Sequence, residues 1–372
     1  MLGLLKKGKK QNNTITDAFF YKFERKCANN HAHEFLDYIT YKRNGPTIAD
    51  AINQIGFYST PKPISSPRKI NVNKEIAGDL VCEFYAKYLP QKAKQVQQII
   101  NQNHPLFLDK STNTYQIFIT DGTQQKVNAV SLKTDKPYLI LECNVTPDVE
   151  GPRVLAHEVA HAISMHQQHR LKLVKNNANM KEFNQYSTAF LGKDCIGEIE
   201  SYIIENLFND FMLKKGLYTP EDLKQYKQEQ QNSLLHETNL IREESDIIKN
   251  LPCPVTKESL ENLQNNLNAN SNQILSNRIQ KMANEEYSSQ YMFRYVVGRV
   301  VADVWIKHFT TANKATQQQM LNNFNNYLDN THNLTLDDAC QTLLDEDFVN
   351  VAQEYTTKDN SNENQNTYTL GG

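Results

Sequence analysis

Two histidines and a glutamate stand at the spacing H-E-x-x-H, formed by His157, Glu158 and His161. Residues four apart on an α-helix differ by about 40° around its axis, so both imidazoles can reach one metal ion while Glu158 stands beside it. In catalytic sites, zinc held by such ligands keeps one position open for water. The spacing therefore predicts one bound Zn²⁺ and hydrolytic chemistry, with Glu158 as the general base.

The residues around this motif are those of a buried helix. Gly151 and Pro152 precede it, and proline is tolerated in the first turn of a helix. Apolar residues recur along the same segment, at Val154, Leu155, Val159, Ala162 and Ile163. The alternative interpretation is a core helix whose two histidines make ordinary hydrogen bonds. A third ligand distinguishes the two, because catalytic zinc usually takes three protein ligands.

The motif's own helix does not supply a third ligand. The metzincin pattern needs a glycine at position 164 and a histidine at position 167, where this chain has Ser164 and Gln167. His166 and His169 would point away from the metal on a continuing helix, so we expect them at the surface. The third ligand is therefore expected from another part of the chain.

A glutamate-containing run from 197 to 208 offers that ligand. Glu198 is the predicted third metal ligand, on a second helix. Positions 198, 201, 202 and 205 share one helical face, so Ser201 and Glu205 are also expected to face the metal helix. Glu205 would orient a histidine or lie exposed, and Ser201 would lie just outside the ligands. Glu200, on the opposite side of the helix, is expected to be solvated.

The pattern E-x-x-S-x-x-x-E-N after H-E-x-x-H resembles the thimet oligopeptidase and oligoendopeptidase F family of zinc metallopeptidases, which are of the gluzincin type. The segment from Tyr291 to Gly298 is similar to a tyrosine-rich Y-x-x-x-Y-x-x-G segment that follows the zinc helices in oligoendopeptidase F. The resemblance covers about residues 75 to 350. It implies that Glu198 is a zinc ligand, and that Tyr291 and Tyr295 are candidate catalytic residues.

The chain departs from this family pattern in several places. Ala160 replaces a glycine, and the linker from His161 to Glu198 is longer than in the family. A family histidine ahead of the tyrosine segment has no counterpart in the region 284–287. Tyr291 and Tyr295 are then the remaining phenolic donors for a developing oxyanion, unless they are two aromatic residues of a packed helix.

Composition indicates a globular protein with a large core. The 372 residues are 39% hydrophobic and 9% aromatic, and no apolar run is long enough to span a membrane or act as a Sec signal. The net charge of −2 and the scattered lysines do not favour nucleic-acid binding. No two of the six cysteines form a C-x-x-C pair, so we expect free thiols and a cytoplasmic location. Delivery into a host cell without a Sec signal is the alternative.

We expect a mainly α fold, with a zincin-like catalytic domain embedded in a helical body. Strands over 114–120 and 124–132 flank Asp121-Gly122, a hairpin signal, and 138–143 is a third strand, giving a small sheet beside the metal-binding helix. Helices are predicted within 73–100, over most of the chain after 152, and over 220–249 and 260–282 in particular. The predicted divisions are an N-terminal segment and linker at 1–70, a catalytic domain at 71–355 and a disordered polar tail at 356–372.

The sequence thus predicts a zinc metalloendopeptidase that cleaves oligopeptides or a flexible segment of a protein. Because only about 150 residues precede the zinc helix, we expect a more open cleft than in the resembled oligopeptidases, whose long N-terminal region walls a channel. Such an enzyme would act on cytosolic peptides or, as a delivered bacterial protein, on a host protein. The alternative function is a catalytically weak or inactive, zinc-stabilised module that binds another protein. The oligomeric state stays open.

Overall fold

The protein was analysed as a computed structural model. It describes residues 39–40, 46–58, 62–101, 116–121, 128–131, 140–175, 196–249, 258, 262, 265, 291–331 and 334–359. Most of the helix predicted over 260–282 and most of the linker between His161 and Glu198 lie outside the described residues.

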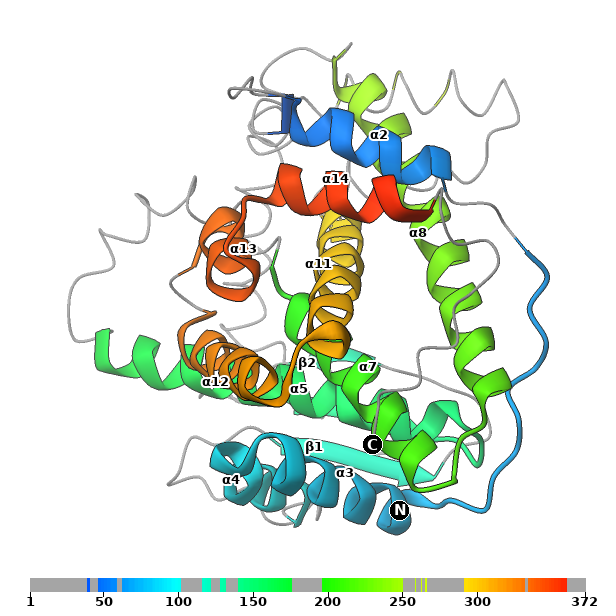
Figure 1. The fold of residues 1–372 in the computed structure, drawn as a ribbon, viewed down its shortest axis with the longest axis vertical. Coiled ribbons are helices and arrows are strands. Elements are labelled where there is room, and N and C mark those ends of the chain that lie inside the picture. Colours follow the sequence, from blue (N-terminus) through cyan, green and yellow to red (C-terminus); the bar gives the residue numbers. More distant parts are fainter. Residues whose placement is uncertain are drawn as a thin grey trace, which may run out of the picture.

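The described chain is mainly α-helical, which confirms the predicted class. The helices within 73–100 and over 220–249 form where their periodicity indicated. Figure 1 shows the order and arrangement of the helices, which are α2 (Ile48–Tyr58), α3 (Lys74–Tyr88), α4 (Pro90–Asn101), α5 (Glu150–Lys175), α7 (Ile199–Lys214), α8 (Pro220–Lys249), α11 (Tyr291–Thr311), α12 (Lys314–Asn330), α13 (Leu336–Leu344) and α14 (Phe348–Asp359).

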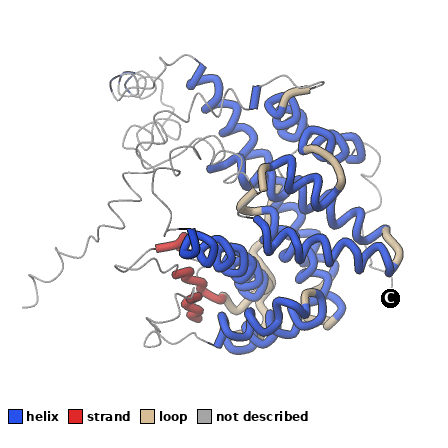
Figure 2. The backbone as a smooth tube through the Cα atoms, turned by 90° about the vertical axis from the view of Figure 1, so that its left-hand side faces the viewer, coloured by secondary structure: helices blue, strands red, loops and turns tan. Residues whose placement is uncertain are grey.

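Three strands pair in the order β1-β3-β2, formed by β1 (Gln116–Asp121), β3 (Ile140–Val145) and β2 (Asn128–Ser131). Strand β1 runs parallel to β3, with Gln116 opposite Ile140, and β2 runs antiparallel to β3. The predicted hairpin between the first two strands is therefore wrong, because β3 lies between them. The Asp-Gly turn signal is local and does not predict that a third strand lies between the two strands it joins. Strand β3 packs against α5, and its residues Cys143 and Val145 are buried. The strands occupy one corner of the helical molecule (Figure 2).

Helix α7 is the central element of the core. It packs against α5 on one side and α11 on another, with α3 also in contact (Figure 1). Nearly every residue of its first three turns is buried, so it has no solvent-exposed stripe there. A helix that is buried around its whole circumference is typical of the centre of a large helical body.

The N-terminal segment also contributes to the core. Ile48, Ala51, Ile52 and Ile55 of α2 stand at the i, i+3, i+4, i+7 spacing, and each is at most 2% exposed. Helix α2 packs against α8 and α14 (Figure 1). At the other end of the chain, α14 continues past residue 355. The domain boundaries predicted at 70 and 355 stay predictions.

No helix among the described residues combines the length and the apolar character needed to cross a lipid bilayer.

Gly298 sets the distance between α11 and α7. A Cβ atom at this position would lie 2.7 Å from the Cβ of Glu198 and 2.9 Å from its backbone carbonyl carbon, closer than real Cβ contacts. We expect Gly298→Ala to lower the free energy of unfolding by about 1–3 kcal/mol, since backbone atoms must move to admit the methyl group. Urea denaturation of the two proteins measures this difference.

Gly78→Ala is the matched control. Its added methyl group would meet only the Cγ2 atom of Ile100, at 2.9 Å, and this side chain can move. Replacing a helical glycine by alanine contributes up to about 1 kcal/mol of helix propensity, so the control is expected to be neutral or stabilising. Equal stability of the Gly298→Ala variant and the unmodified protein would contradict the close approach of the two helices.

Candidate metal centre

His157 and His161 lie one turn apart on α5, and Glu198 lies immediately before the first residue of α7. Their nearest atoms form a small triangle. The two histidine Nε2 atoms are 3.0 Å apart, and Glu198 Oε2 is 3.4 Å from His157 Nε2 and 3.3 Å from His161 Nε2. These are the three residues of the described chain whose spacing could hold a metal ion.

The triangle has the dimensions of a tetrahedral zinc site. With ligand bonds of about 2.0–2.1 Å, neighbouring ligands on a tetrahedron are separated by about 3.3 Å. The observed separations of 3.0–3.4 Å match that length. Two imidazoles and one carboxylate are also a donor set that zinc accepts, as do cobalt and manganese. The residues therefore fit a metal ion of this class.

Glu205 holds the far side of the His157 ring. Its Oε1 atom is 2.5 Å from His157 Nδ1, and its Oε2 atom is 3.6 Å from Arg153 Nε. Burial opposes ionisation of Glu205, but His157 and Arg153 outweigh it and lower the pKa of the carboxyl. A carboxylate at Nδ1 leaves Nε2 for the metal, which is the orienting role predicted for Glu205.

The first turn of α7 shapes the third candidate ligand. Glu198 is 2% exposed, and its backbone has φ −116° and ψ −4° just ahead of the helix. The Ser201 hydroxyl, fully buried, lies 3.0 Å from the carbonyl oxygen of Glu198 and 3.3 Å from its Oε2. Ser201 thus contacts the candidate ligand itself, at the position where the sequence placed it.

The two histidines are affected by the carboxylates around them. Burial lowers the pKa of His157, but its contacts with Glu198 and Glu205 outweigh burial and raise the pKa to about 9. Glu198 responds in the opposite sense. Burial raises its pKa, and the two histidines more than compensate, so that this pKa lies below its usual range.

Glu158 is buried beside the triangle. It is 5% exposed. The pKa of the Cys143 thiol on β3 is raised mainly by burial of the thiol and, to a smaller extent, by the nearby charge of Glu158. Its carboxyl also adds to the negative charge around His161. Glu158 is therefore near both His161 and strand β3, on the same helix as the two candidate histidine ligands.

Glu200 is buried, so the prediction that it is solvated is wrong. It is 3% exposed, and its Oε1 atom lies 3.6 Å from His161 Nδ1. The prediction took the side of the helix opposite Glu198 to face water, which helical periodicity alone suggests. Because other helices surround this end of α7, that side faces protein instead.

Arg294 of α11 is a candidate site residue that the sequence did not single out. Its Nη2 atom lies 3.2 Å from Glu198 Oε1 and donates a hydrogen bond of 3.0 Å to the Tyr295 hydroxyl. Arg294 thereby connects Tyr295, one of the two predicted phenolic donors, to the candidate third ligand. The sequence signal for Arg294 is its positive charge among the uncharged, mostly apolar residues at the start of α11.

Other residues discussed from the sequence lie outside the described part. Tyr291 begins α11, but its side chain is not among those described, and the same holds for His166 and His169 on α5. The region 284–287, where the resembled family has a histidine, is not described either. Their predicted roles stay predictions.

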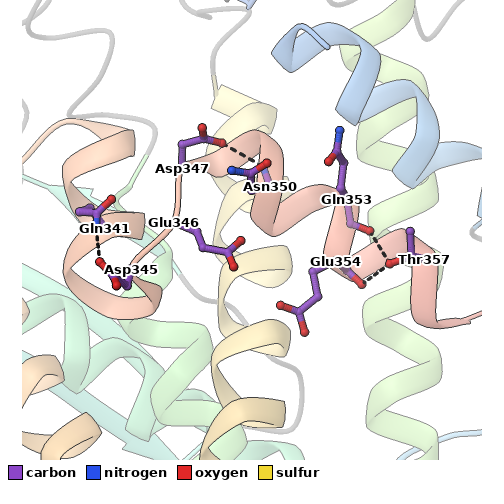
Figure 3. A pocket seen from close by; sticks show the side chains of 8 residues that line it. All are labelled: Gln341, Asp345, Glu346, Asp347, Asn350, Gln353, Glu354 and Thr357. Carbon is purple, nitrogen blue, oxygen red and sulfur yellow. Dashed lines mark hydrogen bonds between the residues drawn. The ribbon is translucent and has the colours of Figure 1, made fainter. Parts of the chain in front are cut away.

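A separate surface pocket lies between α13 and α14, formed by elements other than those that carry the triangle. Figure 3 shows the side chains that line it, which are Gln341, Asp345, Glu346, Asp347, Asn350, Gln353, Glu354 and Thr357. Four of them are acidic, and Glu354 pairs with Lys307 and His308 of α11. An acidic cluster of this kind is common without a ligand, so we assign it no function.

No protein-family model and no curated protein matches the sequence. Among solved structures, the chain is similar to a Bacillus anthracis protein assigned as an oligoendopeptidase F, with 12% identity and a TM-score of 0.44 over 90% of this chain and 55% of the other. It is also similar to a Chlamydophila abortus protein assigned as a peptidase, with 16% identity and a TM-score of 0.40 over 93% and 56%. The chain spans a little over half the length of these two proteins. At these values the likeness carries no argument about activity.

The triangle predicts specific metal binding. We expect one equivalent of Zn²⁺ per chain, and at free zinc about 100 times Kd a rise of about 3 °C in the midpoint of thermal unfolding. His161→Ala should abolish both effects. His308→Ala is the control, because this histidine pairs with Glu354 on another face of the protein. Zinc binding that survives in His161→Ala, measured by elemental analysis after dialysis, would rule the triangle out.

Proposed function

We propose that this protein is a zinc-dependent metalloendopeptidase. The observation that supports the proposal most is the triangle of His157 Nε2, His161 Nε2 and Glu198 Oε2, with separations of 3.0–3.4 Å beside the buried carboxyl of Glu158. A purely structural zinc site usually has four protein ligands and no use for a general base. Three candidate ligands next to a carboxylate favour catalysis.

In this proposal His157, His161 and Glu198 would hold one Zn²⁺. When bound there, zinc lowers the pKa of a water molecule and polarises the carbonyl group of the scissile peptide bond. The carboxylate of Glu158 accepts the proton of the attacking water and later passes it to the leaving amine. Its position on α5, one residue after His157, keeps it beside the water without occupying a ligand position.

The tyrosines complete the proposed site. Tyr291 and Tyr295 are proposed to donate hydrogen bonds to the carbonyl oxygen as negative charge develops on it. Tyr295 is the better supported of the two, because Arg294 contacts both its hydroxyl, at 3.0 Å, and the carboxylate of Glu198, at 3.2 Å. The guanidinium adds positive charge on the same side of the site.

We propose oligopeptides or a flexible segment of a protein as the substrate class, since a peptide must present one scissile bond to a single ion. The three described cysteines, Cys82, Cys143 and Cys340, are free thiols, and a cytoplasmic location stays the proposal that their use supports. The alternative function is an inactive module that binds another protein. The next experiment distinguishes it from a peptidase.

Glu158→Gln tests the role of the proposed base. The amide keeps the size of the side chain but cannot accept the proton, so we expect kcat for a quenched-fluorescent peptide library to fall by at least about 100-fold. The zinc content, read by elemental analysis, should equal that of the unmodified protein. Glu75→Gln, at an exposed position on α3, is the matched control and should retain full activity.

Cleavage by both Glu158→Gln and the unmodified protein would contradict the mechanism. Zinc in the unmodified protein without cleavage of any library member would favour the binding module over the peptidase.

Tyr295→Phe tests the phenolic donor. We expect kcat to fall by about 100-fold with little change in KM, because the hydroxyl would act on charge that exists only in the transition state. Tyr88→Phe removes a phenol that donates to Asp210 instead, and should leave kcat unchanged. If Tyr295→Phe retains its kcat, the donor role passes to Tyr291, which the corresponding variant measures.

A further inference from the structure

Each of the two candidate histidine ligands has a carboxylate of α7 at its Nδ1 atom. Glu205 Oε1 lies 2.5 Å from Nδ1 of His157. On the other ring, Glu200 Oε1 lies 3.6 Å from Nδ1 of His161. This second nitrogen is buried, and within the described part of the chain it has no hydrogen-bond partner. The pair at His161 thus repeats the pair at His157 at a longer distance.

The ring of His161 requires an acceptor at this position. Its Nε2 atom points to His157 and Glu198, where a metal would take the lone pair. A neutral imidazole that binds a metal through Nε2 carries its proton on Nδ1, and a buried N–H without an acceptor is costly. A shift of roughly 0.6 Å would bring Glu200 within the range of an N–H···O hydrogen bond.

The surroundings of Glu200 point to the same partner. Its Oε2 atom lies 3.3 Å from the Tyr327 hydroxyl of α12, which donates to it or to a backbone carbonyl. Burial, and to a smaller extent the charge of Glu200, raises the pKa of the nearby Tyr85 phenol. Among the described residues, His161 is the one cationic or potentially cationic side chain in an ion pair with Glu200.

Glu205 differs in this respect, because Arg153 also pairs with it. A carboxylate buried without an arginine or lysine is destabilising unless strong hydrogen bonds compensate. A hydrogen bond from a metal-bound imidazole would supply that compensation, whereas an apolar residue at position 200 would fill the core at lower cost. The position of Glu200 is therefore explained best by His161.

We propose that Glu200 is a positioning residue of the metal centre, which accepts the Nδ1–H of His161 and so fixes the tautomer and the orientation of this ring. The inference rests on the proposed metal site. It means that Glu198, just ahead of α7, supplies one ligand, and that the first two turns of α7 supply the partners of both other ligands. Tyr327 extends the arrangement to α12 through the second oxygen of Glu200.

Zinc affinity of the purified full chain tests this proposal, measured by competition with a chromophoric chelator. Glu200→Leu removes the acceptor, and we expect Kd for Zn²⁺ to rise 10–100-fold, the loss usual for partners of metal-bound histidines. Glu200→Gln keeps a carbonyl acceptor, so its affinity for Zn²⁺ should fall less than that of Glu200→Leu. Glu205→Gln should weaken binding as well. Glu354→Gln is the matched control, since this glutamate of α14 pairs with Lys307 and with a histidine that is no candidate ligand, His308 of α11.

A second measurement separates positioning from general stability. In zinc-loaded protein labelled with ¹⁵N-histidine, a hydrogen-bonded Nδ1–H gives a downfield proton resonance in NMR spectra. Glu200→Gln should move the resonance of His161 and leave that of His157 in place, and Glu205→Gln should do the reverse. A merely structural role for Glu200 would shift neither resonance selectively.

The outcomes distinguish the two proposals. If the unmodified protein binds no zinc, the metal site itself is wrong. If it binds zinc and a folded Glu200→Leu binds it equally well, the site stands and the role of Glu200 is overturned. Should Glu200→Leu fail to fold, Glu200→Gln decides, because an unchanged His161 resonance in this variant also overturns the proposal.

Discussion

The structure depends on how negative charge is balanced where α5 meets α7. Four glutamates are buried around two imidazoles at this contact, namely Glu158, Glu198, Glu200 and Glu205. Among the described residues, the arginines that pair with them are Arg153 and Arg294. Buried charges are costly unless they are compensated. A divalent ion, or protons on the two imidazoles, would add positive charge at this contact. Metal and protons therefore compete for the same nitrogen atoms.

The packing around α7 keeps these groups in place. Helix α11 approaches so closely that Gly298 leaves no room for a side chain against Glu198, and α5 contacts α7 along the face that carries the histidines. Interiors packed to this density transmit a displacement instead of absorbing it. This packing holds the three donor atoms 3.0–3.4 Å apart, a separation that suits a metal ion bound by all three.

The same arrangement links the candidate metal centre to distant parts of the chain. Tyr327 of α12 reaches Glu200, Arg294 of α11 reaches Glu198, and Cys143 of β3 lies near Glu158. Each of these contacts joins segments separated by many residues in the sequence. Helix α2 also packs against α8 and α14, which lie far from it in the sequence. The candidate site is thus a property of the whole helical body.

The sequence by itself determined the features that follow from local periodicity. The H-E-x-x-H spacing predicted two imidazoles on one face of a helix. The spacing of Glu198, Ser201 and Glu205 predicted that these three residues face that helix. The tertiary structure decided the features that depend on contacts between distant segments. Glu200 is buried because neighbouring helices close the side that periodicity alone left to solvent, and strand β3 separates two strands that a local turn signal would pair. Periodicity describes one element at a time, whereas burial and strand order depend on which elements meet.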